Sequence, residues 1–339
     1  MNILERVRNV FGNAEPQAAG IRTLLISGFG WSGSGALIDY AADHAGVGGF
    51  RKGFEEGSVL KGLYSLAVFY RGVVANKPRT ATDIENLAEA LSGKPGLSAT
   101  IEPQREFVNI KRNENMRREL GDERVDAAVA ELVRRLMAKV DRASGEYRGS
   151  PADVLAAGSE FLEGLKQASL DVRFKEQPEF LILNNDPPGY SVDLFRFHRN
   201  ARYTVVTRDL TDVFATLLEL KRIETDDKAV RNFVRAQRKK VVNFESALLA
   251  ETDAVRRDIA IVEFERFVGV ESVRNAWHDF CGFSREKVGE GFNPEISQRN
   301  AGIGERLPAE VRQAILDGVE TARRALLERL RDHSGVRVL

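Results

Sequence analysis

The apolar positions of this chain follow two patterns, short continuous runs and helical spacing, and the alternation of the two predicts an α/β protein. Short β-branched or apolar runs, typical of buried strands, occur at 22–27, 47–50, 180–183, 203–208 and from 258 onward. Helical spacing occurs at 34–44, 58–70, 190–199, 225–251 and 308–331. Strands that alternate with helices form a mostly parallel sheet covered by helices. We therefore expect a three-layer α/β fold around a mostly parallel central sheet.

Residues 80–176 have a different pattern. They are rich in Arg, Glu and Ala, and helical runs lie near 81–91, 115–144 and 151–168. The stretch 122–140 places Val125, Val129, Leu132, Val133 and Leu136 on one face, which predicts a packed helix with a charged outer side. We interpret 1–339 as a single domain with 80–176 as a helical insertion, either a lid that shapes an acceptor site or additional scaffold.

Composition excludes several classes of protein. Lys plus Arg and Asp plus Glu both number 50, so no net charge favours nucleic acid or an anionic membrane. The basic face of the 225–251 helix, which includes Arg235, Arg238, Lys239 and Lys240, is expected to be solvated. No run of about 20 apolar residues predicts a membrane span.

Cysteine usage points to a reducing compartment. The sole cysteine, Cys281, rules out an internal disulfide, and its apolar surroundings predict a core position. Residues 1–11 have the spacing of an amphipathic helix rather than of a secretory signal. We expect a cytoplasmic protein.

The loop after the first predicted strand is the strongest chemical signal. The stretch Thr23-Leu-Leu-Ile-Ser-Gly-Phe-Gly-Trp-Ser-Gly-Ser-Gly-Ala-Leu-Ile-Asp39 carries an apolar run into four glycines and two serines, and then into a helix. Glycines let the backbone curl with its N–H groups pointing inward, and the helix N-terminus favours an anion. The loop is therefore predicted to bind phosphate.

Two nucleotide-binding patterns match this loop in part. Gly28-x-Gly30-x-x-Gly33, with Glu55 or Glu56 further on, has the form of a dinucleotide-binding fingerprint and would fit an NAD-dependent oxidoreductase. The first and last of those glycines also have Walker spacing, but the next residues are Ser-Gly where Lys and then Ser or Thr are required. Ordinary ATP hydrolysis is therefore not expected.

A second phosphate signal lies in Tyr203–Leu218, a β-branched strand that runs into a helix. Arg208 would end the strand and Thr216 would lie in the helix, so a guanidinium and a hydroxyl can converge on one phosphate. Alternatively, Thr211 or Asp212 caps the helix and Arg208 forms a surface ion pair.

Together these segments resemble the sulfotransferase family. Ser32-Gly33-Ser34 is similar to the core of the family's phosphosulfate loop, and Arg208 and Thr216 occupy the Arg and Ser positions of its 3′-phosphate motif. The segment 258–268, the helix that ends in 277–283, and the loop 297–304 follow in the family's order and spacing. The resemblance covers 23–56 and 180–316.

This resemblance implies a P-loop-like enzyme that transfers a sulfuryl group from 3′-phosphoadenylyl sulfate to a hydroxyl acceptor. In the carbohydrate-type branch, which it resembles more than the phenol-sulfating one, the acceptor is a carbohydrate or glycan. The implied donor-binding residues are Gly30, Trp31, Ser32, Gly33, Ser34, Gly35, Arg208, Thr216, Arg299, Asn300 and Gly302. No metal is expected, because His44, His198, His278 and His333 have no partner at metal-ligand spacing.

Two positions depart from the family pattern. Trp31 stands where the family has Arg or Lys, and Gly35 replaces a hydroxyl residue. A substitute cation would come from Arg51, Lys52 or Lys61. Trp31 would either stack on a sugar or adenine or pack in the interior.

Two carboxylates are candidates for the catalytic base. Asp186 follows the 180–183 strand and precedes two prolines, whereas Glu55 lies between glycines. We prefer Asp186 because a strand end is more rigid and lies at the sheet edge where α/β proteins place their chemistry. A nucleotide-binding protein without transfer activity remains an alternative, and neither the acceptor nor the oligomeric state follows from the sequence.

Overall fold

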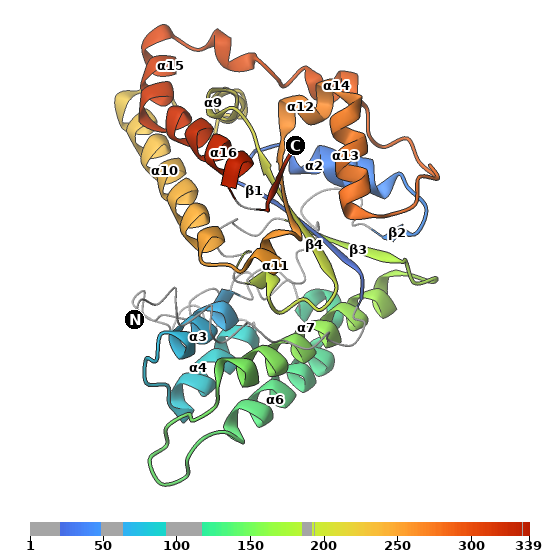
Figure 1. The fold of residues 1–339 in the computed structure, drawn as a ribbon, viewed down its shortest axis with the longest axis vertical. Coiled ribbons are helices and arrows are strands. Elements are labelled where there is room, and N and C mark those ends of the chain that lie inside the picture. The colour runs from blue at the N-terminus through green and yellow to red at the C-terminus, as the bar shows by residue number, and fades with distance from the viewer. Residues whose placement is uncertain (1–20, 49–63, 93–116, 185–191, 193, 334) are drawn as a thin grey trace. The chain divides into compact units, whose positions relative to one another are not determined.

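A computed structural model describes residues 21–48, 64–92, 117–184, 192, 194–333 and 335–339 (Figure 1). By its internal contacts the chain divides into two compact units. The first comprises 1–23, 52–183 and 193–201, and the second comprises 24–51, 184–192 and 202–339. The interpretation of 1–339 as one domain, with 80–176 as a lid over the acceptor, stays a prediction.

Six strands form one mostly parallel sheet, in the order β2-β3-β1-β4-β5-β6. They are β1 (Thr23–Gly28), β2 (Val47–Gly48), β3 (Phe180–Asn184), β4 (Ala201–Thr207), β5 (Ile259–Glu263) and β6 (Arg337–Val338). β5 pairs in parallel with both β4 and β6. The α/β fold with a mostly parallel central sheet is thus confirmed. The sequence pattern missed β6, whose two residues are too few to show a period.

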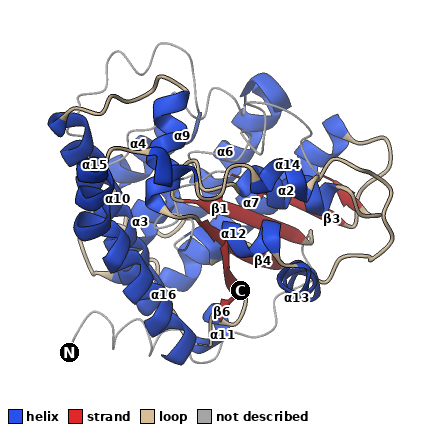
Figure 2. Ribbon diagram, turned by 90° about the horizontal axis from the view of Figure 1, so that it is seen from above, coloured by secondary structure: helices blue, strands red, loops and turns tan. Residues whose placement is uncertain are grey.

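The second unit packs helices on both sides of its strands (Figures 1 and 2). On one side lie α2 (Ser34–Ala42), α13 (Glu271–Cys281) and α14 (Pro294–Gln298), and on the other lie α10 (Asp227–Leu249), α15 (Ala309–Ile315) and α16 (Thr321–His333). Further helical elements of this unit are α9 (Leu210–Glu219), α11 (Asp253–Arg256), α12 (Phe264–Gly269) and the 3₁₀ turn η3 (Ile303–Arg306). β5 is buried along Ile259–Val262, and Cys281 is buried as predicted.

The single helix expected over 308–331 is interrupted. Between α15 and α16 the chain forms a π-helical turn, η4 (Leu316–Glu320), which packs against α10. A Cβ on Gly318 would lie 2.6 Å from a methyl carbon of Val234, so the glycine permits this close approach. Glu320 at the end of the turn is fully buried.

The described residues of the first unit form four long helices, and neighbours in sequence contact each other. They are α3 (Tyr64–Val74), α4 (Ala81–Ser92), α6 (Asp122–Met137) and α7 (Pro151–Arg173). Val125, Val129, Leu132 and Leu136 of α6 are buried, which confirms the predicted apolar face.

Helix boundaries in this unit differ from the predicted ones. The run expected over 115–144 is broken at Gly121, whose φ is 84°, and ends at Met137. Asp141 then organises a turn by accepting a hydrogen bond from the Ala143 amide. α7 extends to Arg173 and begins with a capping box between Ser150 and Asp153. Of the helix expected over 190–199, the helical part ends at Phe195.

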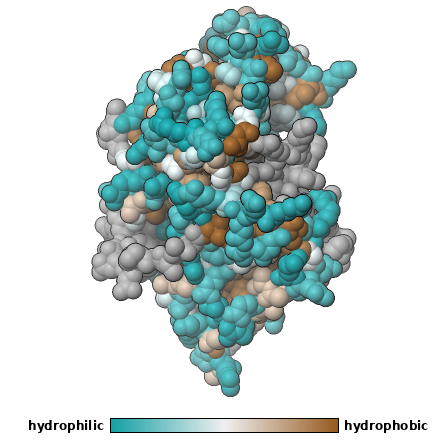
Figure 3. Space-filling view, turned by 90° about the vertical axis from the view of Figure 1, so that its right-hand side faces the viewer, coloured by the Kyte–Doolittle hydropathy of each residue, from teal (hydrophilic) through white to brown (hydrophobic). Residues whose placement is uncertain are grey.

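The surface drawn in Figure 3 is mostly hydrophilic, with apolar residues in smaller groups between polar ones. Among the described residues, no helix has both the length and the apolar character needed to cross a membrane.

Candidate functional site

The glycine loop between β1 and α2 needs glycine at specific positions. Gly30, Trp31 and Gly33 have φ values of 88°, 56° and 87°, in the left-handed region that favours glycine. A Cβ on Gly28 would lie 1.8 Å from Oγ of Ser32, and one on Gly33 would lie 2.1 Å from the ring of Phe264. The predicted curled loop is therefore present, and its shape depends on these residues.

The backbone N–H groups of this loop are available to a ligand. In the part of the chain that the structure describes, the N–H groups of residues 30–35 donate no hydrogen bond, and no side chain caps the N-terminus of α2. Successive unpaired N–H groups at a helix N-terminus, together with the helix dipole, make a favourable place for an anion. The loop therefore fits a phosphate or phosphosulfate group.

Arg208 links two of the predicted donor-binding segments. It follows the end of β4, which is the neighbour of β1 in the sheet, and its side chain is only 4% exposed. Its guanidinium donates to the carbonyl oxygens of Trp31 at 3.1 Å and Asn300 at 2.5 Å, and its Cζ lies 5.3 Å from the ring centre of Phe264. The glycine loop and the turn near residue 300, far apart in sequence, therefore meet at this arginine.

The remaining nitrogen of Arg208 is unsatisfied. Its Nε is buried and has no hydrogen-bond partner among the described residues. Burial lowers the pKa of Arg208, and the nearby carboxylate of Asp212 opposes this shift. Because a guanidinium retains its proton even so, the site holds a buried positive charge. The alternative of Arg208 in a surface ion pair is wrong.

Asp212 anchors the turn that carries Gly302. Its two carboxylate oxygens accept hydrogen bonds of 2.7 Å from the amides of Gly302 and Gly304. Burial raises the pKa of Asp212, while the two amide hydrogen bonds act against that rise. The cap of α9 is Asp209, which accepts from the amide of Thr211 at 2.8 Å, so neither residue proposed as the cap has that role. Asp212 instead positions the 302–304 turn.

Of the predicted donor-binding residues, Trp31 and Asn300 hydrogen-bond to Arg208 through their backbone carbonyls, and no other does so among the described residues. The hydroxyl of Thr216 donates to the carbonyl of Asp212 at 2.9 Å, within α9, and forms no hydrogen bond with Arg208 or the glycine loop in the described structure. Arg299 and Asn300 are exposed at the end of α14. Ser32 is buried, whereas Ser34 and Gly35 are half-buried at the start of α2.

Trp31 is 49% exposed, so the expectation that it packs in the interior is wrong. Its carbonyl faces Arg208 while its indole lies at the surface, where it is free to stack on a ligand. The proposed bases Asp186 and Glu55, and the cations suggested at Arg51, Lys52 and Lys61, lie outside the described residues.

Lys240 was expected on a solvated face and lies at the glycine loop instead. Its ammonium donates to the carbonyl oxygen of Phe29 at 2.6 Å, and burial lowers its pKa. The sequence did contain a signal: Lys240 lies seven residues after Phe233 and four before Phe244, on the stripe of α10 that is buried. A lysine on an apolar stripe predicts a side chain that is at least partly buried.

Glu265 is a further carboxylate near Arg208 that the sequence did not single out. It follows β5, and its Oε1 accepts from the amide of Asp209 at 2.9 Å. Burial raises its pKa. This contact ties the end of β5 to the segment that begins α9.

Histidines do not form a metal centre in the described part of the chain, where no group of three or more His, Cys, Asp and Glu side chains could hold an ion. The fold does bring His44 and His278 together, with ring centres 4.8 Å apart. Each ring nitrogen that is bonded faces a carbonyl oxygen, that of Tyr40 or that of Phe283.

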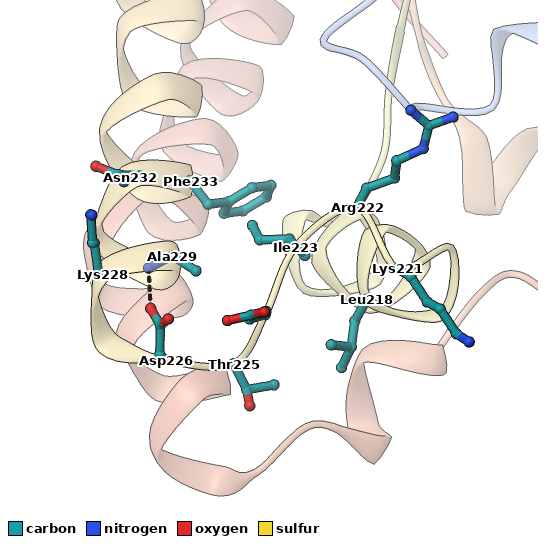
Figure 4. A pocket seen from close by; sticks show the side chains of 11 residues that line it. Leu218, Lys221, Arg222, Ile223, Thr225, Asp226, Lys228, Ala229, Asn232 and Phe233 are labelled. Carbon is teal, nitrogen blue, oxygen red and sulfur yellow. Dashed lines mark hydrogen bonds between the residues drawn. The ribbon is translucent and has the colours of Figure 1, made fainter.

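A separate cavity of about 780 Å³ lies between the end of α9 and the start of α10 (Figure 4). Ile223 and Phe233 face each other across it, while Arg222 points away. The carboxylate of Asp226 caps α10 by accepting from the amide of Ala229 at 2.6 Å. None of the predicted donor-binding or catalytic residues lines this cavity.

Two solved structures are similar to this chain. The sulfotransferase domain from the Synechococcus PCC 7002 olefin synthase aligns at 14% identity with a TM-score of 0.44, over 91% of this chain and 98% of that one. The sulfotransferase STF9 from Mycobacterium avium aligns at 12% identity with a TM-score of 0.39, over 99% of this chain and 84% of that one. No family model and no curated protein matches the chain significantly. At these values neither likeness carries a functional argument, and we base the proposed function on the site.

Proposed function

We propose that this protein binds 3′-phosphoadenylyl sulfate and transfers its sulfuryl group to a hydroxyl acceptor. The observation that carries the proposal is the buried Arg208, whose guanidinium lies between the glycine loop and the 299–302 turn and keeps Nε unpartnered. The unpaired N–H groups of the glycine loop can bind one phosphate, and the buried Arg208 beside the loop can bind a second. A donor with phosphates at both its 5′ and 3′ positions needs both.

The proposed roles follow from the chemistry of the residues. The amides of 30–35 would hold the 5′-phosphosulfate, and Arg208, Thr216, Arg299 and Asn300 would hold the 3′-phosphate. Gly302, whose amide is bonded to Asp212, would shape the turn beside it. The bound donor supplies an activated sulfuryl group. In the transfer, the bond between sulfur and the phosphate oxygen breaks, a bond from sulfur to the acceptor oxygen forms, and the leaving adenosine 3′,5′-bisphosphate takes the electron pair.

A base must remove the proton of the acceptor hydroxyl, and Asp186 or Glu55 is proposed for it. The acceptor that we propose is a carbohydrate or glycan, on the resemblance of the sequence to that branch of the family. Trp31 would offer its exposed indole to a sugar or to adenine.

Calorimetric titration of two nucleotides tests donor binding. We expect wild-type protein to bind adenosine 3′,5′-bisphosphate more tightly than adenosine 5′-phosphate, and Arg208→Ala to weaken the bisphosphate roughly 10- to 100-fold, the value of a charge-assisted hydrogen bond. Binding of adenosine 5′-phosphate should change little. Arg238→Ala, at an exposed position of α10, is the matched control. Equal losses for both nucleotides would show that Arg208 does not hold the 3′-phosphate.

Two other functions make different predictions. An NAD-dependent oxidoreductase would be stabilised thermally by NAD and not by the bisphosphate, and that result would overturn the assignment. A nucleotide-binding protein without transfer activity is favoured by the exposed Trp31 in place of a cation. Tight bisphosphate binding without transfer of labelled sulfate to any member of a carbohydrate and hydroxyl panel would favour it.

A further inference from the structure

The glycine loop contains no basic residue, but α10 places the ammonium of Lys240 beside it. Lys240 lies on α10, and its ammonium is bonded to the carbonyl of Phe29, the residue that opens the loop. A Cβ on Gly30 would lie 3.3 Å from the same nitrogen, so the ammonium is in contact range of the loop backbone. The charge therefore sits beside the loop although no basic residue occurs within it.

The position of Lys240 is held by packing. One turn further along α10, Phe244 is 1% exposed and meets Phe29 edge to face, with ring centres 5.7 Å apart. Val241 is also buried. These side chains fix α10 against the start of the loop. The ammonium of Lys240 is therefore held beside the loop and does not extend into solvent.

The ammonium is incompletely satisfied. It has three donors, and in the described part of the chain only the carbonyl of Phe29 accepts from it and no carboxylate pairs with it. A half-buried cation without a counter-ion is unfavourable, and an anionic ligand at the loop would supply both the missing charge and the missing acceptors.

We infer that Lys240 is the residue that replaces the missing loop cation, contacting the 5′-phosphate of the donor and stabilising the charge that the leaving bisphosphate gains. This inference rests on the proposed function. It gives a role to Lys240, which is not among the donor-binding residues that the family resemblance implies. Arg208 and Lys240 would then divide the ligand between them, the arginine holding the 3′-phosphate and the lysine the 5′-phosphate.

The test uses the full chain and two variants that remove the charge. Lys240→Gln keeps a polar tip, and Lys240→Met keeps the apolar stem that packs on α10. The matched control is Lys239→Gln, whose side chain is exposed at the preceding position of the helix. Melting temperatures of all variants are recorded without ligand, and each is titrated with adenosine 3′,5′-bisphosphate and with adenosine 3′-phosphate.

We expect both Lys240 variants to bind the bisphosphate roughly 10- to 100-fold more weakly than the wild type and to bind adenosine 3′-phosphate equally well. Lys239→Gln should bind both ligands as the wild type does. Lys240→Arg should restore most of the lost affinity, because it restores the charge. An equal loss for both ligands, or no loss for the bisphosphate, would overturn the role of Lys240. Failure of the wild type to bind the bisphosphate would overturn the proposed function itself.

Discussion

Replacing Gly33 by alanine tests whether the loop geometry depends on glycine for the reasons that the structure gives. Gly33 has a φ of 87°, and an added Cβ would meet three carbons of the Phe264 ring at 2.1, 2.6 and 2.8 Å. Nothing but a shift of the ring or of the loop relieves contacts this short. The same ring lies over the guanidinium of Arg208, so a shift would also disturb the proposed phosphate site.

The expected magnitude has two parts. An alanine in the left-handed region costs about 1–2 kcal/mol, and overpacking of a buried site costs about 1–3 kcal/mol. We therefore expect Gly33→Ala to lower the free energy of unfolding by about 2–5 kcal/mol. Gly35 is the matched control, because it lies in α2 with nothing within 4 Å of an added Cβ. Alanine there should stabilise by up to about 1 kcal/mol through helix propensity.

Urea unfolding followed by circular dichroism measures both variants, with the slope of the transition checked for equality before midpoints are compared. Titration with adenosine 3′,5′-bisphosphate then shows whether the Gly33 variant also loses affinity. Equal stability of Gly33→Ala and Gly35→Ala would refute the argument from the Phe264 contact.

Three further outcomes are expected. Asp212→Asn removes one of the two charged acceptors of the turn amides and should destabilise the protein by about 2–4 kcal/mol and weaken bisphosphate binding, measured by urea unfolding and calorimetry; unchanged values for both would contradict its role in anchoring the turn. Arg323→Ala removes the bidentate partner of the fully buried Glu320, which keeps its contact with Arg324, and should cost about 3 kcal/mol in the same unfolding assay, the lower end for a broken buried pair. A cost within the error of the measurement would count against a buried pair. Burial lowers the pKa of His44 and of His278. Below pH about 6.5, the ordinary pKa of histidine, the unfolded chain therefore binds more protons than the folded protein. Stability that is present above that pH is lost as the pH falls through the lower folded-state pKa values. The melting temperature should therefore be lower at pH about 5.5 than at pH about 7.5, and less so in the His44→Gln, His278→Gln double variant; an identical pH profile in that variant would show that other groups carry the effect.

The sequence by itself determined the local elements and their type. Continuous apolar runs located β1, β3, β4 and β5, and helical periods located α2, α6 and α10, because each pattern reports which side chains of one element are buried. The glycine spacing predicted the curled loop, since positive φ values at Gly30 and Gly33 are a local property of the backbone. The strand end at Thr207 also placed Arg208 at the carboxyl edge of the sheet.

Only the tertiary structure decided which of these elements meet. The loop after β1 reaches Arg208 because β4 is the neighbour of β1 in the sheet, and strand order is not encoded in the period of either strand. From the sequence, Lys240 is one of several charges on a basic helix. In the structure Phe244 packs against Phe29, and Lys240 lies at the glycine loop. From the sequence, Asp212 is a candidate cap of the helix that follows Arg208. In the structure its carboxylate accepts hydrogen bonds from the amides of Gly302 and Gly304 instead. The conformation of the glycine loop is thus a local property of the sequence, whereas the charges around it are brought there by long-range packing, which no local pattern records.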